Sequence, residues 1–485
     1  MTPMDVTVIF ILLFATAFLY IAIKSYDKER SYNKYFFASK TISKNENAAS
    51  YVARFTSLAT VMAFFLVYAQ YDGLYLLVAP VTVLLGVLVF SKILEKAKYK
   101  ASGTLPKELE RMYNSKGAGF VALFISGTAL TVVLLIEIYL GVTLLSVFVS
   151  DTPGGLPFVV MFVTGIAILY TGIGGLSAVI STDKIQAYLI YITVPCLILA
   201  FFIGIGIGVG EIKYFPRAAF EIKESVFDSV FLLPIPLLLN ILTVNLLLLP
   251  SLLSSWQLLN SSPNLHEFTR GISNGGRSVL ILWSLFIVLG LVIGTSKSEI
   301  NGIYDIFNIL RNSNNLIITY VLFPLLFVGC FAALLSTADS AILPIAQSIY
   351  DNFRKNSDDL LNRKSLWSIL LMLWVVIVLL YVLFFDVLNF DFISILFTVF
   401  GLSVVMTPAI FLGILAPKLA KRPGSGKVAI FSMLTGFVTS IGFVTLGKIS
   451  NESHIIQLGA PFGAIAATLA LSPFLFKAGT LRNDD

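Results

Sequence analysis

Charge, cysteine and histidine are all scarce in this sequence of 485 residues. Only 12% of the residues are charged, and the chain contains two cysteines and two histidines. Cys196 and Cys330 both fall in apolar runs, where neither a disulfide framework nor a thiolate metal site is expected. The sequence therefore gives no indication of redox chemistry.

Apolar residues are abundant instead. Hydrophobic residues make up 57% of the chain, and the mean hydropathy is +0.90, which indicates a polytopic membrane protein. The first apolar run, Val6 to Ile23, has no basic residues before it and no small-residue cleavage site after it. We therefore expect a retained span rather than a signal peptide. The formal charge of +6 is typical of basic cytoplasmic loops, and no nucleic-acid partner is expected.

Apolar windows of about 20 residues predict an all-α polytopic membrane protein with about thirteen transmembrane helices. These spans are expected to begin near residues 6, 48, 74, 118, 156, 185, 229, 278, 316, 366, 391, 427 and 455. One set of loops carries most of the basic residues: Lys24 to Lys44, Lys92 to Lys116, Arg270, Arg277, Arg354 to Lys364, Lys418 to Lys427 and Arg482. These loops mark the cytoplasmic side. The sequence thus predicts a plasma-membrane protein with its N-terminus outside and its C-terminus in the cytoplasm.

Ionisable residues within spans are costly, so each of them suggests a function. In "FAALLSTADSAIL", Ser336, Asp339 and Ser340 share one helix face, and Ala333 and Thr337 lie beside them. Such a strip of hard oxygen ligands suits a small cation, and sodium or a proton is the natural candidate. In the alternative interpretation, the hydroxyls bond back to their own helix and Asp339 contacts a neighbouring helix.

Arg54 and the polar run that follows it interrupt the beginning of another span. Irregular backbone at membrane depth is tolerated where it lines a cavity or water. Alternatively, Arg54 extends to the cytoplasmic surface. Glu137 lies near the middle of its span and needs a partner or a proton, and we select Arg54 as that partner.

Two further segments carry polar groups. Asp183 follows the glycine-rich run "YTGIGGLSAVIST", where the glycines predict a turn between spans; its alternative role is to cap the next helix. The span that begins near Val230 is interrupted by prolines and carries Asn245 and Gln257. Such spans are typical of a transporter's central site, whereas the alternative is a kinked helix whose amides bind its neighbours.

These residues resemble the sodium/solute symporter family, which includes the sodium/proline, sodium/galactose and sodium/sialic acid transporters. The segment "YTGIGGLSAVISTDKIQ" (Tyr170 to Gln186) looks like the family's glycine-pair signature, and "AALLSTADSAIL" is similar to its Ser-Thr-Ala-Asp-Ser stretch. Phe400 to Val438 also resembles the family's late helix, basic loop and following helix. The resemblance covers nearly the whole chain, from about Tyr35 to the last span.

The resemblance implies the leucine-transporter type of fold, an inverted repeat of five plus five helices. It divides the chain into an N-terminal helix and loop (1–47), a first repeat (48–210), an extracellular loop (211–228), an inverted second repeat (229–415) and two C-terminal helices with a short tail (416–485).

The resemblance also implies specific sites. The first sodium site consists of the backbone carbonyls of Ala53, Thr56 and Ala333 and the hydroxyls of Ser336 and Thr337. A second sodium site, present in some members, consists of Asp183, Ser336, Asp339 and Ser340. The candidates for substrate binding are Arg54, Ser57, Glu137, Asn245 and Gln257. Sodium is the coupling ion, and no other cofactor is expected.

Departures from the family pattern leave the substrate open. Phe55 replaces the aspartate of the proline transporters, and Arg54 replaces a small residue. An arginine in the cavity favours a carboxylate-bearing solute. The sequence thus predicts a sodium-coupled symporter in the lipid membrane, not an enzyme. The alternatives are a proton-coupled carrier that uses Asp339 and Glu137, and a solute-sensing membrane module that signals through a separate partner.

Overall fold

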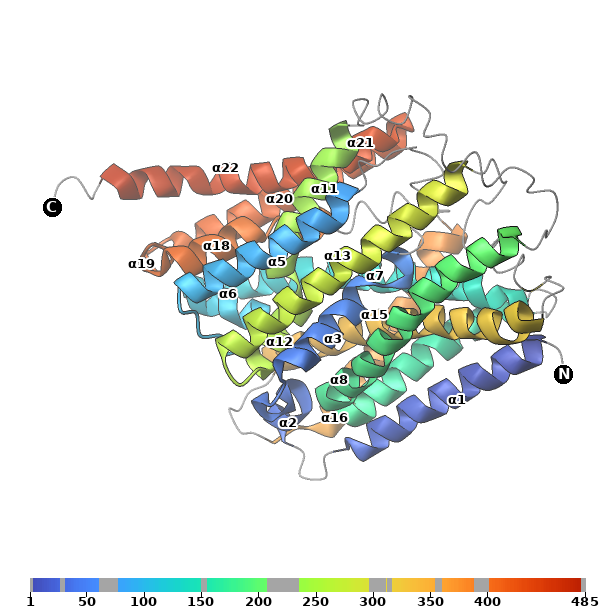
Figure 1. The fold of residues 1–485 in the computed structure, drawn as a ribbon. Coiled ribbons are helices and arrows are strands. Elements are labelled where there is room, and N and C mark those ends of the chain that lie inside the picture. The colour runs from blue at the N-terminus through green and yellow to red at the C-terminus, as the bar shows by residue number, and fades with distance from the viewer. Residues whose placement is uncertain are drawn as a thin grey trace.

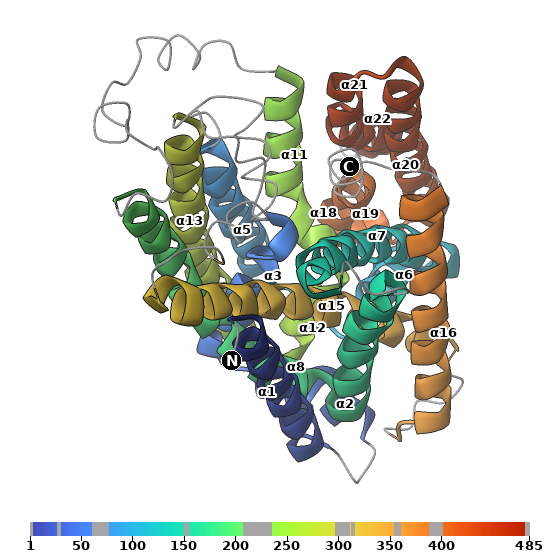
Figure 2. The ribbon, with the colours of Figure 1, turned by 90° about the vertical axis from the view of Figure 1, so that its right-hand side faces the viewer.

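The computed structural model describes residues 3–26, 31–60, 77–149, 155–206, 235–295, 311, 316–353, 360–387 and 401–480. Within these ranges the regular elements are helices, and an isolated β-bridge pairs Ser31 with Leu360. The prediction of an all-α polytopic membrane protein is confirmed. Figures 1 and 2 show the helices packed as one bundle, with α15 crossing its interior.

The chain contains both long and short helices. The long helices are α1 (Pro3–Lys24), α5 (Val78–Lys96), α7 (Lys116–Val149), α8 (Gly155–Gly206), α13 (Leu265–Thr295), α15 (Phe323–Phe353), α16 (Arg363–Tyr381), α20 (Ser425–Ser450) and α22 (Gly459–Thr480). The shorter elements are α2 (Tyr32–Phe37), the 3-10 helix η1 (Ala38–Lys40), α3 (Lys44–Phe55), α6 (Leu105–Tyr113), α11 (Ile235–Ser251), α12 (Leu253–Ser261), the π-helices η3 (Ile318–Leu322) and η4 (Val382–Val387), α18 (Thr407–Leu415), α19 (Pro417–Ala420) and α21 (Ser453–Gln457).

Eight helices of the described chain are long and apolar enough to cross a membrane, or nine if the bent pair α11 and α12 forms one span. The number of thirteen is therefore not confirmed. The span expected near residue 391 begins outside the described residues, as does the expected loop 211–228. Figure 1 places the start of α1 and the end of α22 at opposite sides of the molecule. Which side faces the cytoplasm stays a prediction.

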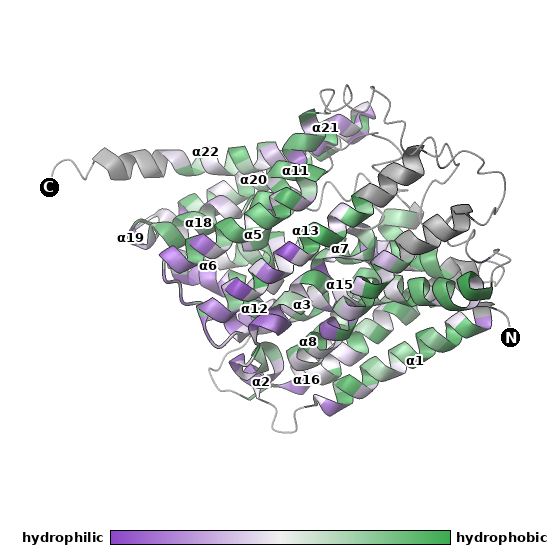
Figure 3. Cartoon of the chain, in the orientation of Figure 1, coloured by the Kyte–Doolittle hydropathy of each residue, from purple (hydrophilic) through white to green (hydrophobic). Residues whose placement is uncertain are grey.

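Burial distinguishes the peripheral helices from the central one. Apolar residues of α1 and α16 are largely exposed, as expected of helices that face lipid. Along α15, by contrast, nearly every side chain from Phe323 to Ser348 is buried. Figure 3 shows hydrophilic residues around α2, α6 and α12, at one end of the bundle. A polar group on α15 therefore meets other protein groups rather than lipid.

The glycine pair produces a kink within α8, where the sequence predicts a turn between two spans. Gly175 has φ +60° and ψ −154°, a conformation that only glycine adopts readily. The Tyr35 hydroxyl donates hydrogen bonds to the carbonyls of Thr171 and Gly172, at 2.9 and 3.1 Å, just before the kink. The helix resumes directly after Gly175 rather than near residue 185 as expected.

The reason for this difference lies in the polar residues after the kink. The sequence offered Asp183 as a cap of the next helix, but Ser181 and Thr182 donate to carbonyls four residues earlier in the helix, at 2.8 and 3.1 Å. Asp183 therefore lies well inside α8 and does not cap a helix.

Replacing Gly175 with alanine should destabilise the fold. The new methyl group would lie 2.5 Å from the Tyr35 carbonyl oxygen, and the backbone strain alone costs about 1–3 kcal/mol. We expect a lower midpoint of thermal unfolding in detergent. Gly165→Ala is the matched control, because it lies in the same helix with no atom within 4 Å of the new methyl group. Equal midpoints for the two variants would contradict the role assigned to Gly175.

Candidate functional site

The site is built around a break at the end of α3. This helix starts with a capping box between Ser43 and Glu46 and ends at Phe55, because Thr56 has φ −105° and ψ 60°. A helical segment resumes at residue 58. The predicted interruption is therefore confirmed. The last carbonyls of a helix lack partners within it, and those of α3 include the Ala53 carbonyl.

Protein groups at the break form hydrogen bonds with some of the backbone groups that have no partner within a helix there. The Phe55 carbonyl accepts hydrogen bonds from the Trp283 indole at 3.0 Å and the Thr60 hydroxyl at 3.2 Å. On the other side of the break, Glu137 Oε1 of α7 accepts the Ala59 N–H at 3.1 Å. A carboxylate at a helix N-terminus is favourable. Glu137 is fully buried, and together with Ser57, whose hydroxyl accepts the Thr60 N–H at 3.1 Å, it satisfies N–H groups just after the break.

The predicted pairing of Arg54 with Glu137 is wrong. Arg54 Nε instead lies 3.8 Å from Asp183 Oδ2, and Nη1 donates to the Ser254 carbonyl at 3.3 Å. The arginine side chain is only 7% exposed, so it does not reach the cytoplasmic surface. Its Nη2 has no hydrogen-bond partner among the described residues.

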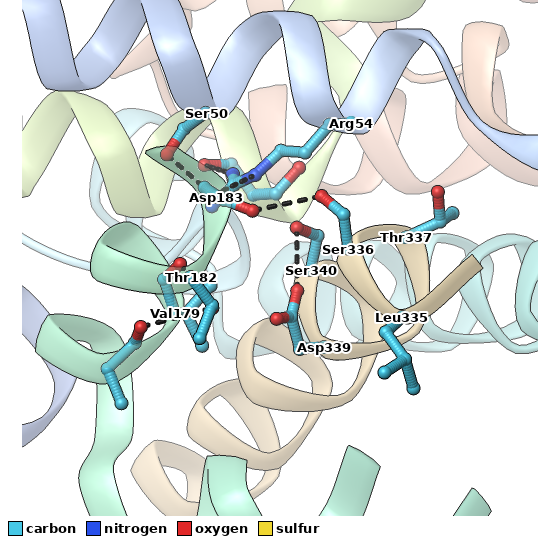
Figure 4. Close-up of polar contacts among 12 residues, drawn as sticks. Ser50, Arg54, Val179, Thr182, Asp183, Leu335, Ser336, Thr337, Asp339 and Ser340 are labelled. Atoms are coloured by element: carbon cyan, nitrogen blue, oxygen red, sulfur yellow. Dashed lines mark hydrogen bonds and ion pairs between the residues drawn. The ribbon is translucent and has the colours of Figure 1, made fainter. Parts of the chain in front are cut away.

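Asp183 joins α3, α8 and α15. Its Oδ2 accepts the Ser50 hydroxyl at 2.6 Å, and its Oδ1 accepts the Ser336 hydroxyl at 2.9 Å. Figure 4 shows Ser50, Arg54 and Ser336 converging on this carboxylate. The fully buried charge thus has hydrogen bonds and a cation beside it, as buried charges require.

The other polar side chains on this part of α15 point in two different directions. Asp339 accepts hydrogen bonds from the Tyr170 hydroxyl and, at 3.2 Å, from the Ser340 hydroxyl. Thr337 donates to the Ala333 carbonyl at 3.2 Å and points away from Asp183 (Figure 4). Thr337 therefore bonds back to its own helix, as the alternative interpretation proposed, whereas Ser336 contacts Asp183 of α8.

A small cavity lies between the break and α15. Thr56 and Ala333 both line it, together with Thr193 of α8. The hydroxyls of Thr56 and Thr193 are buried and have no hydrogen-bond partner among the described residues. This cavity brings two residues of the first predicted sodium site together, and it adds unsatisfied oxygen atoms.

A larger cavity of about 210 Å³ lies on the other side of the break. Four of the predicted substrate-binding residues line it: Arg54, Ser57, Glu137 and Asn245. Thr337 and Ser340 contribute from α15, and the remaining wall is mostly apolar, with Leu130, Val133, Ile136, Ile241, Val244, Leu248 and Trp283. The Asn245 amide donates to the Ala79 carbonyl at 3.1 Å and the Thr82 hydroxyl at 3.0 Å, which connects α11 to α5.

Gln257 does not line this cavity, so its place among the substrate-binding candidates is corrected. Its amide donates to Gln347 Oε1 at 2.8 Å and to the Phe36 carbonyl at 3.3 Å. The two residues are twelve positions apart, roughly 18 Å along a helix, and they lie in different helices, α11 and α12.

The sequence reasoning missed Ser50 and Tyr170, which contact the two buried aspartates. A signal was present for each of them. Ser50 lies four residues before Arg54, on the same face of α3, and Tyr170 opens the glycine-rich motif. Neither residue is charged near neutral pH, so neither one stands out as an ionisable residue within a span.

A buried polar network links α12, α15 and α2. Gln347 accepts from Gln257 and donates to the Tyr32 hydroxyl at 3.4 Å, and that hydroxyl donates to Asp351 at 2.5 Å. Gln347 is completely buried. The network therefore holds the ends of these helices together.

Gln347→Leu should lower stability by about 1–3 kcal/mol, because the buried Gln257 amide loses its acceptor. Ser348→Ala is the control, since that neighbouring hydroxyl is buried and has no hydrogen-bond partner among the described residues. Thermal unfolding of the two variants measures the difference. A Gln347→Leu midpoint no lower than that of Ser348→Ala would contradict the role of the network.

Comparisons with known proteins support the fold. No family model and no curated protein sequence matches this chain. Among solved structures, a Na+-coupled sialic acid symporter matches with a TM-score of 0.68 and 17% identity, over 96% of this chain and 98% of the other. The structure of MhsT in complex with L-phenylalanine matches with a TM-score of 0.52 and 13% identity, over 89% and 98% of the two chains. A mutant of the manganese transporter of Eremococcus coleocola gives 0.55 and 12%, over 92% and 96%.

These structures carry different substrates on a similar helical arrangement, so the likeness concerns the fold. The chain shares the fold of these transporters, and the leucine-transporter type expected from the sequence is confirmed at that level. The residue boundaries of the two repeats stay a prediction.

Proposed function

We propose that this protein is a sodium-coupled symporter that imports a small organic solute by alternating access. The observation that carries the proposal is the position of the break in α3, which faces the oxygen-rich side of α15 beside a cavity. Irregular backbone, hydroxyls and a buried carboxylate meet at this point. The similarity of the fold to a Na+-coupled symporter supports the same conclusion.

The proposed sodium ligands are the carbonyls of Ala53, Thr56 and Ala333 and the hydroxyls of Ser336 and Thr337. The shared cavity of Thr56 and Ala333 and the terminal position of Ala53 in α3 support the three carbonyl ligands. The hydroxyls of Ser336 and Thr337 are carried over from the sequence resemblance. Ser336 and Thr337 use their hydroxyl protons in hydrogen bonds, and a hydroxyl that donates keeps lone pairs for a cation. Oxygen ligands of this kind suit a hard ion.

The proposed solute carries a carboxylate on a compact apolar body. Arg54 lines the larger cavity, and its Nη2 has no hydrogen-bond partner among the described residues. A guanidinium binds carboxylates well. Glu137 does not pair with Arg54, because Arg54 lies beside Asp183 and Glu137 Oε1 accepts the Ala59 N–H. The apolar walls would contact the rest of the solute.

Sodium entering down its gradient would supply the free energy of uptake. Sodium would hold the end of α3 against α15, and the solute would occupy the neighbouring cavity. A change to an inward-open state, by movement of the predicted repeats 48–210 and 229–415, would then release both. Each net positive charge that enters adds about 2.3 kcal/mol per 100 mV of membrane potential.

Thermal stability in sodium chloride and in choline chloride tests the coupling. We expect a carboxylate solute to raise the unfolding midpoint only with sodium, by about 2.7 kcal/mol of stability at a hundredfold excess over its Kd. Ser336→Ala combined with Thr337→Ala should abolish this effect, while the control Ser348→Ala retains it. Stabilisation that is indifferent to sodium but depends on pH would contradict the proposal and favour Asp339 and Glu137 as proton carriers.

The carboxylate requirement has its own test. Converting the carboxylate of a bound solute to a primary amide removes a hydrogen-bonded charge, and such bonds contribute about 1.5–3 kcal/mol. We expect a weakening of about tenfold to a hundredfold, measured by competition binding. The methyl ester serves as a second neutral analogue. Equal affinity for acid and amide would exclude Arg54 as the carboxylate partner.

A further inference from the structure

We infer that the guanidinium of Arg54 serves as a tethered cation for Asp183, so that the chain binds a single sodium ion, at the first site. This inference rests on the proposed function and specifies how many ions couple to transport. The second sodium site implied by the sequence resemblance, which includes Asp183, would be occupied by the protein's own side chain.

The cluster around Asp183 has the chemistry of a cation site. Asp183 and Asp339 are both fully buried carboxylates. The hydroxyls of Ser50 and Ser336 contact Asp183, and that of Ser340 contacts Asp339. Hydroxyl and carboxylate oxygens from several helices are what a small hard ion prefers. A buried carboxylate also requires a nearby positive charge.

Arg54 already provides that positive charge. Its Nε lies 3.8 Å from Asp183 Oδ2, and Asp339 also acts on it electrostatically. The Ser254 carbonyl of α12 holds the opposite side of the guanidinium at 3.3 Å. In Figure 4 the arginine extends from α3 toward Asp183, on the same side as Ser50. The guanidinium therefore lies between Asp183 and the Ser254 carbonyl.

A sodium ion bound to Asp183 would lie a few ångströms from a permanent positive charge. Arginine is not deprotonated in proteins, and the surroundings are buried, so this repulsion is only weakly screened. The first site shares Ser336 with this cluster, but its proposed ligands are neutral, and Thr56 and Ala333 line a cavity that neither Arg54 nor Asp183 lines. Sodium binding at the Asp183 cluster would therefore require the removal of Arg54.

Counting bound sodium tests the inference directly. Equilibrium binding of radioactive sodium to the purified full chain, at saturating sodium and without solute, should give one ion per chain. Arg54→Gln, which keeps a side-chain amide for the Ser254 carbonyl, should raise the number to two. Combining Arg54→Gln with Asp183→Asn should return it to one, and Arg54→Lys should leave it at one.

Several outcomes would overturn the inference. Two sodium ions in the wild type would show that Arg54 does not replace an ion. One ion in a folded Arg54→Gln protein would show that the Asp183 cluster does not bind sodium once the arginine is gone. If Arg54→Gln unfolds, the numbers of sodium ions bound per chain by the wild type and by Arg54→Lys still test the inference. No bound sodium in the wild type or any variant would overturn the sodium-coupled function itself, and with it this inference.

Discussion

A fully buried carboxylate needs partners, and Asp183 takes them from the helices on either side of it. Ser50 of α3 and Ser336 of α15 donate hydrogen bonds to it, and Arg54 lies beside it. Removing any of these groups would leave a charge in a region without water, which costs far more than a lost hydrogen bond at a surface. Asp183 therefore ties α3 and α15 to α8.

The break in α3 adds a second constraint, because its buried backbone groups also need partners. Backbone groups at membrane depth must be satisfied within the protein, and Glu137, Thr60 and Trp283 meet this need at the break. The carbonyls that remain are those that a cation can use. The features that hold the fold together and the features that bind an ion are thus next to each other in α3.

Features that depend on local sequence could be predicted. The polar run after Arg54 indicated the break in α3, and the glycine pair indicated a turn where the chain kinks at Gly175. The oxygen face of α15 followed from helical periodicity alone. These predictions succeed because the backbone conformation there is set by residues that are adjacent in the chain.

The partners of the charged groups could not be predicted in the same way. Glu137 accepts a backbone N–H, and any residue type can supply one, so no sequence pattern marks it. Asn245 and Gln257 lie in one proline-interrupted segment, and both were candidates for substrate binding. Gln257 instead donates a hydrogen bond to Gln347. Tertiary packing determines these hydrogen-bond partners, and local sequence patterns do not reveal it.

The weak geometry of the Arg54 and Asp183 pair has a consequence for transport. At 3.8 Å the two groups attract one another without a direct hydrogen bond, so the guanidinium can shift toward a solute carboxylate while it still balances Asp183. Arg54 stays with the protein and carries no charge across the membrane. One sodium ion together with a monocarboxylate would then move no net charge, so the sodium concentration gradient, rather than the membrane potential, would drive uptake.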